Sequence, residues 1–237
     1  MGFKQKLLHR INKSLSCHYE EDKVVSFLHT ANISIHSRGL DVGCGYGRNM
    51  EVIINTFGCE LEGVDINSKI VEENRKRGLK CCTVEEFQNR EEKSKYDFII
   101  LSHVIEHFHP ENLKEFLEYY LSFLKLGGVV IVSTPVLSQW FYWDFDHIKP
   151  YHPVGISMVF GNNSAQVQYY SKFQLKLMDI WFHKTPYKLN YVRGIYVKCW
   201  CSYFCLCIDW IYALLYKLSF GFIGTTTSWS GIYKKIC

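Results

Sequence analysis

Several common sequence features are missing from this chain. It contains no repeats or low-complexity stretches, and no signal peptide precedes its ten cysteines. Because the cysteines also cluster irregularly, we expect reduced thiols and a cytoplasmic setting. The sixth residue is neither Ser nor Thr, and Cys237 ends the chain without a prenylation box, so lipid anchoring is not predicted.

The cysteines near the carboxyl end also lack the C-x₂-C spacing of common metal sites. The pairs Cys199/Cys201 and Cys205/Cys207 each enclose one apolar residue, so we expect small hydrophobic side chains on a buried helix. The stretch 199–216 is short for a membrane span, and its Asp209 would cost about 2.5 to 3.5 kcal/mol at the membrane centre. We expect a helix that covers a pocket or touches a membrane surface.

Composition favours one packed domain with a small insertion. Of the 237 residues, 48% are hydrophobic and 21% are charged, which suits a single α/β domain. The net charge of +4 is uneven, because residues 171–237 carry +7 and residues 1–170 carry −3. The basic, aromatic tail suggests an anionic partner, such as a lipid headgroup, a phosphorylated sugar carrier or nucleic acid. A solvated basic face over an aromatic core is an equal alternative.

Three glycines occupy alternate positions in a short segment between an apolar stretch and a stretch with a helical pattern. The segment Leu40–Met50 reads Leu-Asp-Val-Gly-Cys-Gly-Tyr-Gly-Arg-Asn-Met. Because glycine has no Cβ atom, the chain can turn tightly there and its backbone can approach a ligand. An acidic residue, Asp65, follows about twenty positions later at the end of a predicted strand, where such folds bind a ribose. The pattern predicts a nucleotide site.

Strand and helix patterns alternate after this loop. Strands are predicted at 39–43, 60–65, 79–84, 96–101 and 129–133, with further candidates within 168–184 and 231–236. Helices are predicted at 2–15, 20–30, 48–57 and 68–77, and from Pro110 to the Gly127-Gly128 pair. This alternation indicates a mostly parallel sheet with helices on both faces. Tyr19 is expected to reach the pocket.

With the Gly63–Ile66 run and the stretch Asp97-Phe-Ile-Ile-Leu-Ser-His-Val-Ile-Glu-His107, the glycine loop resembles class I (Rossmann-like) S-adenosylmethionine (SAM) dependent methyltransferases of the small-molecule type. The resemblance implies an α/β fold with a seven-stranded, mostly parallel sheet whose last strand is antiparallel. It also implies SAM as cofactor, held by residues near the ends of the first four strands. These are Asp41, Gly43, Cys44, Gly45, Gly47, Asp65, Ile66, Thr83, Val84, Ser102 and His103.

Two of these assignments have alternatives. Asp65 could instead cap the helix that starts at Ser68, and the two roles are compatible. After the third strand, relatives often present an acidic residue to the adenine, but here Thr83 and Val84 precede Glu85. Which of the three meets the adenine stays open.

A polar loop follows the fifth strand and carries the pattern Asp-x-Asp-His-x-x-Pro-Tyr at 144–151. It resembles a loop over the acceptor pocket of such enzymes. His147 is the first candidate for a general base, with Asp146 and His107 as further catalytic candidates. Local hydrogen bonding is the alternative for His147 and Asp146, and an ion pair or helix cap for Glu106 and His107. No metal is predicted, although Asp144, Asp146 and His147, with His103 or His107, offer suitable donors.

We therefore expect a SAM-dependent methyltransferase acting on a small or lipid-linked acceptor, by O-methylation of a glycan or isoprenoid-type intermediate. RNA methylation and a non-catalytic SAM-binding scaffold are the alternatives. The expected organisation is one domain over 1–237, with an N-terminal helical lid at 1–35 and an aromatic, basic insertion at 186–227 before the last strand. We expect a cytoplasmic location, with peripheral membrane contact through the insertion as a hypothesis.

Overall fold

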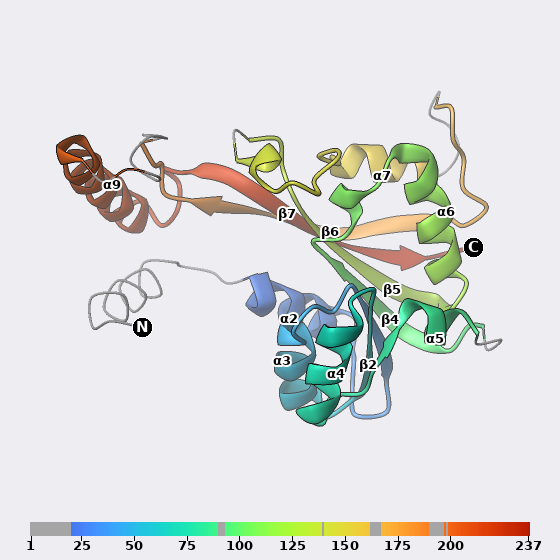
Figure 1. Ribbon diagram of the computed structural model, residues 1–237. Helices are drawn as coiled ribbons and strands as arrows, with labels where there is room; N and C mark the ends of the chain where they lie inside the picture. The colour runs from blue at the N-terminus through green and yellow to red at the C-terminus, as the bar shows by residue number, and fades with distance from the viewer. Residues whose placement is uncertain (1–19, 90–92, 139, 162–166, 190–196, 198) are drawn as a thin grey trace. The chain divides into compact units, whose positions relative to one another are not determined.

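The computed structural model (Figure 1) describes residues 20–89, 93–138, 140–161, 167–189, 197 and 199–237. The chain forms two compact units, which we describe separately. One comprises Glu20–Trp181 with Ser228–Cys237, and the other comprises Met1–Tyr19 with Phe182–Thr227. The predicted helix at 2–15 and Tyr19 lie outside the described residues.

A seven-stranded sheet has the order β3-β2-β1-β4-β5-β7-β6. Its strands are β1 Arg38–Val42, β2 Glu60–Asp65, β3 Cys81–Thr83, β4 Tyr96–Ser102, β5 Leu124–Pro135, β6 Leu175–Thr185 and β7 Thr225–Lys235. The pairs among β1 to β5 are parallel, and β7 pairs antiparallel with β5. The predicted seven-stranded, mostly parallel sheet with an antiparallel last strand is confirmed.

Helices cover both faces of the sheet (Figure 1). They are α2 Glu20–Thr30, α3 Arg48–Phe57, α4 Ser68–Lys76, α5 Val84–Gln88, α6 Pro110–Leu121 and α7 Pro153–Phe160. Alternate residues of β4 divide the core: Phe98 and Ile100 pack with α2, α3 and α4, whereas Ile99 and Leu101 pack with α5, α6 and α7. A strand buried on both faces explains its unbroken apolar sequence.

The third predicted strand is shorter than expected, and a helix was missed after it. Thr83 ends β3 and caps α5, because its side chain accepts a hydrogen bond from the Glu86 amide while Glu86 bonds back to the Thr83 amide. This capping box starts a helix where the apolar pattern alone suggested more strand. The short helix α7 was also not predicted.

The Gly127-Gly128 pair does not end the helix that begins at Pro110. That helix ends at Leu121, and β5 already begins at Leu124. The pairing of β5 with β4 passes from Leu124 to Val129 while β4 advances by only two residues. The two glycines therefore form an excursion within a strand, and Gly127 takes a positive φ of 79° there.

The second unit contains α9, Trp200–Leu218. One stripe of α9 contacts the preceding segment 182–189: Asp209 accepts the Leu189 amide at 2.7 Å, and the Tyr216 hydroxyl donates to the Lys184 carbonyl at 2.7 Å. Tyr216 is the helix's buried residue, whereas Cys201 and Cys207 are exposed. The prediction of cysteines on a buried helix is therefore wrong, since only a narrow stripe of the helix is packed.

Candidate active site

The glycine loop lies between β1 and α3. Gly43, Gly45 and Gly47 take φ values of 71°, 50° and 72°, a region that other residues rarely adopt. A Cβ atom on Gly43 would also lie 2.5 Å from Val104 Cγ2. The glycines are therefore required by the backbone path, and Gly47 serves as the N-cap of α3.

Asp65, at the carboxyl end of β2, holds this loop from the neighbouring strand. One carboxylate oxygen accepts the Gly45 amide at 2.9 Å, and the other accepts the Asn67 amide at 2.8 Å. The cap of α4 is Asn67, whose side chain accepts the Lys69 amide. Asp65 is thus not the helix cap considered above, and it orders the loop with a nearly buried charge.

One cavity runs along the carboxyl ends of the strands and has a volume of about 880 Å³. Five of the predicted cofactor residues line it: Gly43, Asp65, Ile66, Val84 and His103. Ile66 is 82% exposed, and a large apolar side chain at a cavity wall suits an aromatic ring. Thr83 caps α5, so Val84 is the residue of the Thr83-Val84-Glu85 set that lines the cavity.

Two predicted cofactor residues face the protein core. The thiol of Cys44 lies 4.0 Å from that of Cys81, in the layer beneath the loop. Asp41 is buried at 2% exposure, and its Oδ2 has no hydrogen-bond partner. Burial, with the nearby Cys81 and Asp65, raises the pKa of Asp41 to about 7. A buried acceptor beside a glycine loop fits a bound ligand that brings a hydrogen-bond donor.

The exit of β4 carries an ionic network that reaches α2. The Ser102 hydroxyl donates to Glu20 Oε1 at 2.7 Å, and His103 Nε2 lies 3.1 Å from Glu20 Oε2. Burial disfavours the charged imidazole, but Glu106 and Glu20 outweigh it and raise the pKa of His103 to about 10. His103 also has a positive φ of 55°. Two carboxylates therefore hold a strained, protonated side chain at the cavity wall.

Glu106 is the buried centre of the side-chain cluster at the exit of β4. It lies in a 3-10 turn, η1 Ile105–His107, and is 0% exposed. Its Oε2 accepts from the Thr134 hydroxyl at the end of β5, at 2.9 Å. Its Oε1 has no hydrogen-bond partner, although His103 Nδ1 lies 3.3 Å away in ion-pair range. The main-chain oxygen of Glu106 accepts the amides of Ile148 and Lys149 from the polar loop.

The polar loop brings its histidine to this carboxylate. His147 Nε2 lies 4.0 Å from Glu106 Oε1 and 3.8 Å from Asp144 Oδ2. Its Nδ1 donates to the main-chain oxygen of Phe141 at 2.7 Å, and His107 Nδ1 donates likewise to that of Asp146 at 3.0 Å. The two imidazole rings are 5.0 Å apart. Because Nδ1 makes the contact with the carbonyl in each ring, Nε2 of each ring is free of these carbonyl contacts.

The structure thus groups His107 and His147 with Glu106, and Asp146 joins them through its main-chain oxygen, which contacts His107. His107 and Asp146 line the cavity. The contribution of Glu20 was missed, because this residue lies more than twenty positions before the glycine loop, at the start of a separate helix. The depth of Glu106 was missed as well. Its signal was the apolar Val-Ile pair before it, which indicates that the turn points into the core.

The fold and the site together define an α/β protein that binds a nucleotide-like cofactor at its glycine loop. The methyltransferase-domain family matches residues 9–192. No curated protein sequence matches the chain. Among solved structures, a SAM-dependent methyltransferase from Archaeoglobus fulgidus is 23% identical, with a TM-score of 0.58 over 91% of this chain and 95% of that one. The YcgJ protein of Bacillus subtilis is 14% identical, with a TM-score of 0.59 over 92% and 98% of the two chains.

Because the family match covers most of the sequence, this chain belongs to the methyltransferase-domain family. It is a class I, Rossmann-like, SAM-dependent methyltransferase, as predicted. The residues present fit the cofactor: the glycine turn leaves no Cβ in its path, Asp65 is held at the end of β2, and Asp41 offers a buried acceptor without a partner.

Proposed function

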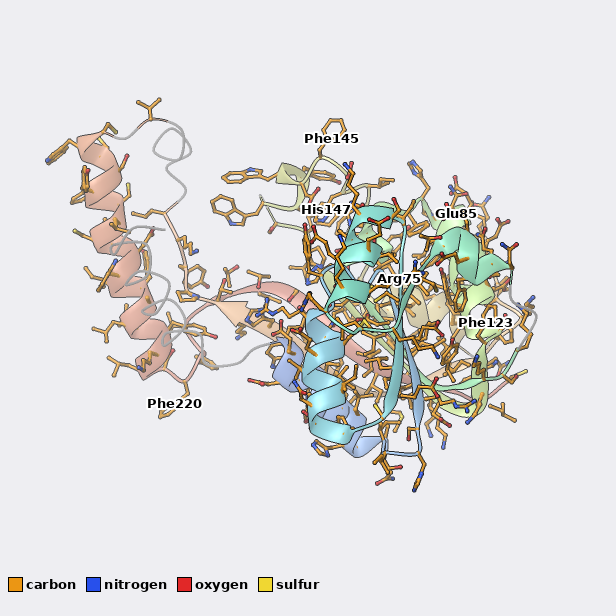
Figure 2. All side chains as sticks on the ribbon, turned by 60° about the horizontal axis from the view of Figure 1, so that its bottom comes forward. Arg75, Glu85, Phe123, Phe145, His147 and Phe220 are labelled. Carbon is orange, nitrogen blue, oxygen red and sulfur yellow. The ribbon has the colours of Figure 1, made fainter. Side chains whose placement is uncertain are left out.

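We propose that this enzyme methylates a hydroxyl oxygen of a glycan or isoprenoid-type intermediate, carried on a lipid or free as a small molecule. The proposal rests on the composition of the loop after β5. This loop carries a histidine that lies beside a buried carboxylate, and it also carries exposed aromatic side chains. Phe145 is 99% exposed, Tyr142 62% and Trp143 48%. Figure 2 shows Phe145 projecting outward from the loop that holds His147. Aromatic rings suit sugar faces and lipid chains alike.

The cofactor half would be built by the residues listed above. The methionine part of SAM would lie along the backbone of Gly43, Cys44, Gly45 and Gly47. Asp65 would bind the ribose, and Ile66 would contact the adenine. Val84 lines the cavity beyond them, with Thr83 behind it, and Ser102 and His103 lie at the β4 exit. When bound, SAM supplies an electrophilic methyl group on a sulfonium, which needs little further activation.

His147 would act as the general base. In O-methylation the acceptor oxygen gains a methyl group and loses its proton, and a neutral imidazole nitrogen can take that proton. Nε2 of His147 is suited to this because Nδ1 already donates to Phe141. His107 is the second candidate, and Asp146 would support it through the main-chain oxygen that holds its Nδ1.

Replacement of His147 tests the base assignment. We expect His147→Ala to lower turnover at least tenfold and to leave the affinity for SAM unchanged, as measured by calorimetry. His152→Ala is a matched control, because His152 is an exposed histidine that caps α7. If the turnover of His147→Ala equals that of the control, His147 is not the base.

A lipid-linked acceptor is supported by α9 in the second unit. This helix has a mean hydropathy of 1.3, is long and apolar enough to cross a membrane, and is 6% buried. Its exposed large side chains include Trp200, Phe204, Ile211, Leu214 and Leu218, while Asp209 lies on the stripe that contacts residue 189. Because the charge of Asp209 lies on the packed stripe, the exposed side of the helix is apolar. We propose that this side lies in the membrane surface. Lys184, Lys188 and Lys217 would favour anionic lipid.

Vesicle binding tests this part. We expect the full chain to sediment with phosphatidylglycerol vesicles more than with phosphatidylcholine vesicles, and Leu214→Glu to reduce that binding about tenfold. Asn55→Glu, on the exposed side of α3, introduces the same charge elsewhere. Equal binding by the two variants would remove membrane contact and leave a small, soluble acceptor.

The remaining organisation follows from this proposal. The chain would act as one methyltransferase domain over 1–237 in the cytoplasm, with 1–35 as a lid and 186–227 as the insertion that holds the membrane. RNA methylation lacks the Asn/Asp-Pro-Pro-Tyr and Pro-Cys patterns that would support it. SAM binding without methyl transfer to any acceptor would favour the scaffold alternative.

A further inference from the structure

We propose that Glu106, His107 and His147 form a binding site for one divalent transition-metal cation at the acceptor side of the cavity. The ligand atoms of these three residues all lie within 4.8 Å of one another. Two imidazole nitrogens and one carboxylate oxygen are a donor set that suits Mn²⁺, Fe²⁺, Co²⁺ or Zn²⁺ better than Mg²⁺.

Each imidazole is oriented as a metal ligand would be. Histidine ligands commonly donate the other ring nitrogen to a carbonyl or carboxylate, which sets the tautomer and the ring direction. Here Nδ1 of His107 and Nδ1 of His147 both donate to main-chain oxygens, at 3.0 and 2.7 Å. Both Nε2 atoms are therefore the basic ones, and both belong to the group around Glu106.

The carboxylate supplies the second, independent observation. Glu106 is fully buried, and its Oε2 is held by Thr134, while its Oε1 has no hydrogen-bond partner among the residues that the structure describes. Leaving a buried carboxylate oxygen unpaired is costly, and a cation removes that cost. His103 Nδ1 lies 3.3 Å from the same oxygen.

The distances require only a small closing movement. Two ligand atoms on one such cation are about 3 to 3.5 Å apart, given bonds of about 2.1 Å. His147 Nε2 and Glu106 Oε1 are 4.0 Å apart. His147 belongs to a loop that is hydrogen-bonded to the Glu106 main chain through Ile148 and Lys149. The backbone of the loop is therefore already attached to the residue that carries the carboxylate.

The role of the cation rests on the proposed function. His107 lines the cavity, so a cation bound to it would have open positions toward the acceptor. There it would bind the acceptor oxygen and favour loss of its proton. With the cation bound, His147 would be a ligand and not the base. The acceptor hydroxyl, made more acidic by the cation, would lose its proton to solvent water in the cavity that His107 lines, while its oxygen gains the methyl group and the sulfonium leaves as the neutral thioether.

A Mn²⁺ titration of the full chain tests the site. Mn²⁺ is the probe because the exposed thiols Cys201, Cys207 and Cys237 bind it weakly. After dialysis against a chelator, free Mn²⁺ is counted by electron paramagnetic resonance. We expect one bound equivalent in the wild type and at least tenfold weaker binding in Glu106→Gln and in His147→Gln. Thermal melts check that each variant is folded.

His109→Gln is the matched control, since His109 is exposed and lies two residues from His107; it should bind Mn²⁺ like the wild type. Absence of a stoichiometric equivalent in the wild type, or equal binding by Glu106→Gln, would overturn the site. SAM titration and methyl transfer on the same samples separate the two proposals. SAM binding with chelator-resistant transfer leaves the function standing without a metal role, whereas no SAM binding by any sample refutes the function itself.

Discussion

The carboxyl ends of β1 and β2 differ in construction from the ends of β4 and β5, and residues at the ends of β1, β2 and β4 line the same cavity. At β1 and β2 the site is made by backbone geometry: three glycines with positive φ and two amides held by Asp65. At β4 and β5 it is made by side chains that converge from separate elements, with Glu106 joined to Thr134, His103 and His147. A backbone site tolerates few changes, whereas a side-chain site can be altered without loss of the cofactor.

The largest effect is expected from Asp65→Ala. The change removes two charge-assisted hydrogen bonds to the loop, each worth about 1.5 to 3 kcal/mol, so the dissociation constant of SAM should rise about 100-fold. Calorimetric titration with SAM and S-adenosylhomocysteine measures it. Glu60→Ala, at the exposed start of the same strand, should bind SAM like the wild type. Unchanged affinity in Asp65→Ala would contradict the view that the loop geometry held by Asp65 forms the SAM site at β1 and β2.

Gly43→Ala should weaken SAM binding about tenfold. The backbone at this position has a φ of 71°, and a residue with a Cβ atom adopts that conformation at a cost of about 1 to 2 kcal/mol. It would also contact Val104 Cγ2 at 2.5 Å. Adding Val104→Ala relieves the contact but not the φ, so the double variant should recover part of the affinity. No recovery would mean that the contact with Val104 does not contribute.

Thr134→Val should lower turnover by about tenfold and leave SAM affinity unchanged. The change removes the hydrogen bond that orients Glu106. Loss of a residue that hydrogen-bonds to a metal ligand, the role proposed for Glu106, lowers activity about 10- to 100-fold. Thr134→Ser keeps the hydroxyl and should restore turnover, which a purely packing role for Thr134 would not predict. Parallel losses of turnover and SAM affinity would show that the two ends are coupled.

The last expected effect is on stability and not on SAM binding or turnover, and it is a pH-dependent change at Asp41. The folded protein raises the pKa of Asp41 from 3.8 to about 7, so it binds this proton more tightly than the unfolded chain does. The protein therefore loses stability as pH rises from about 4 to 7, and the loss is complete above that range. Asp41→Asn removes the charge, and should raise the free energy of unfolding relative to wild type by about 2 to 3 kcal/mol more at pH 8 than at pH 5, because each pH unit between pH 5 and the folded pKa contributes about 1.4 kcal/mol. Equal differences at both pH values in denaturant titrations would contradict a buried, neutralised Asp41.

The sequence indicated the cofactor end more fully than the acceptor end, for a physical reason. Glycine spacing and the residues of a strand end are local, so helix Arg48–Phe57 and strand Glu60–Asp65 were predicted with the observed bounds. Helix α5 was missed because a capping interaction between Thr83 and Glu86 overrode the strand pattern. The exposure of α9 could not be predicted, because an apolar helix has the same composition whether a core or a membrane covers it.

By itself the sequence determined the parallel α/β sheet and the glycine turn with Asp65, because each depends on neighbouring residues and on backbone conformation. The antiparallel last strand was expected from the family resemblance, and it pairs with a strand about 100 residues earlier. Only the tertiary structure decided which side chains meet. Glu20, Glu106, Thr134 and His147 come from a helix, a turn, a strand and a loop spread over more than 120 positions. Their chemistry arises from a shared buried space, and the packing of the whole sheet creates that space.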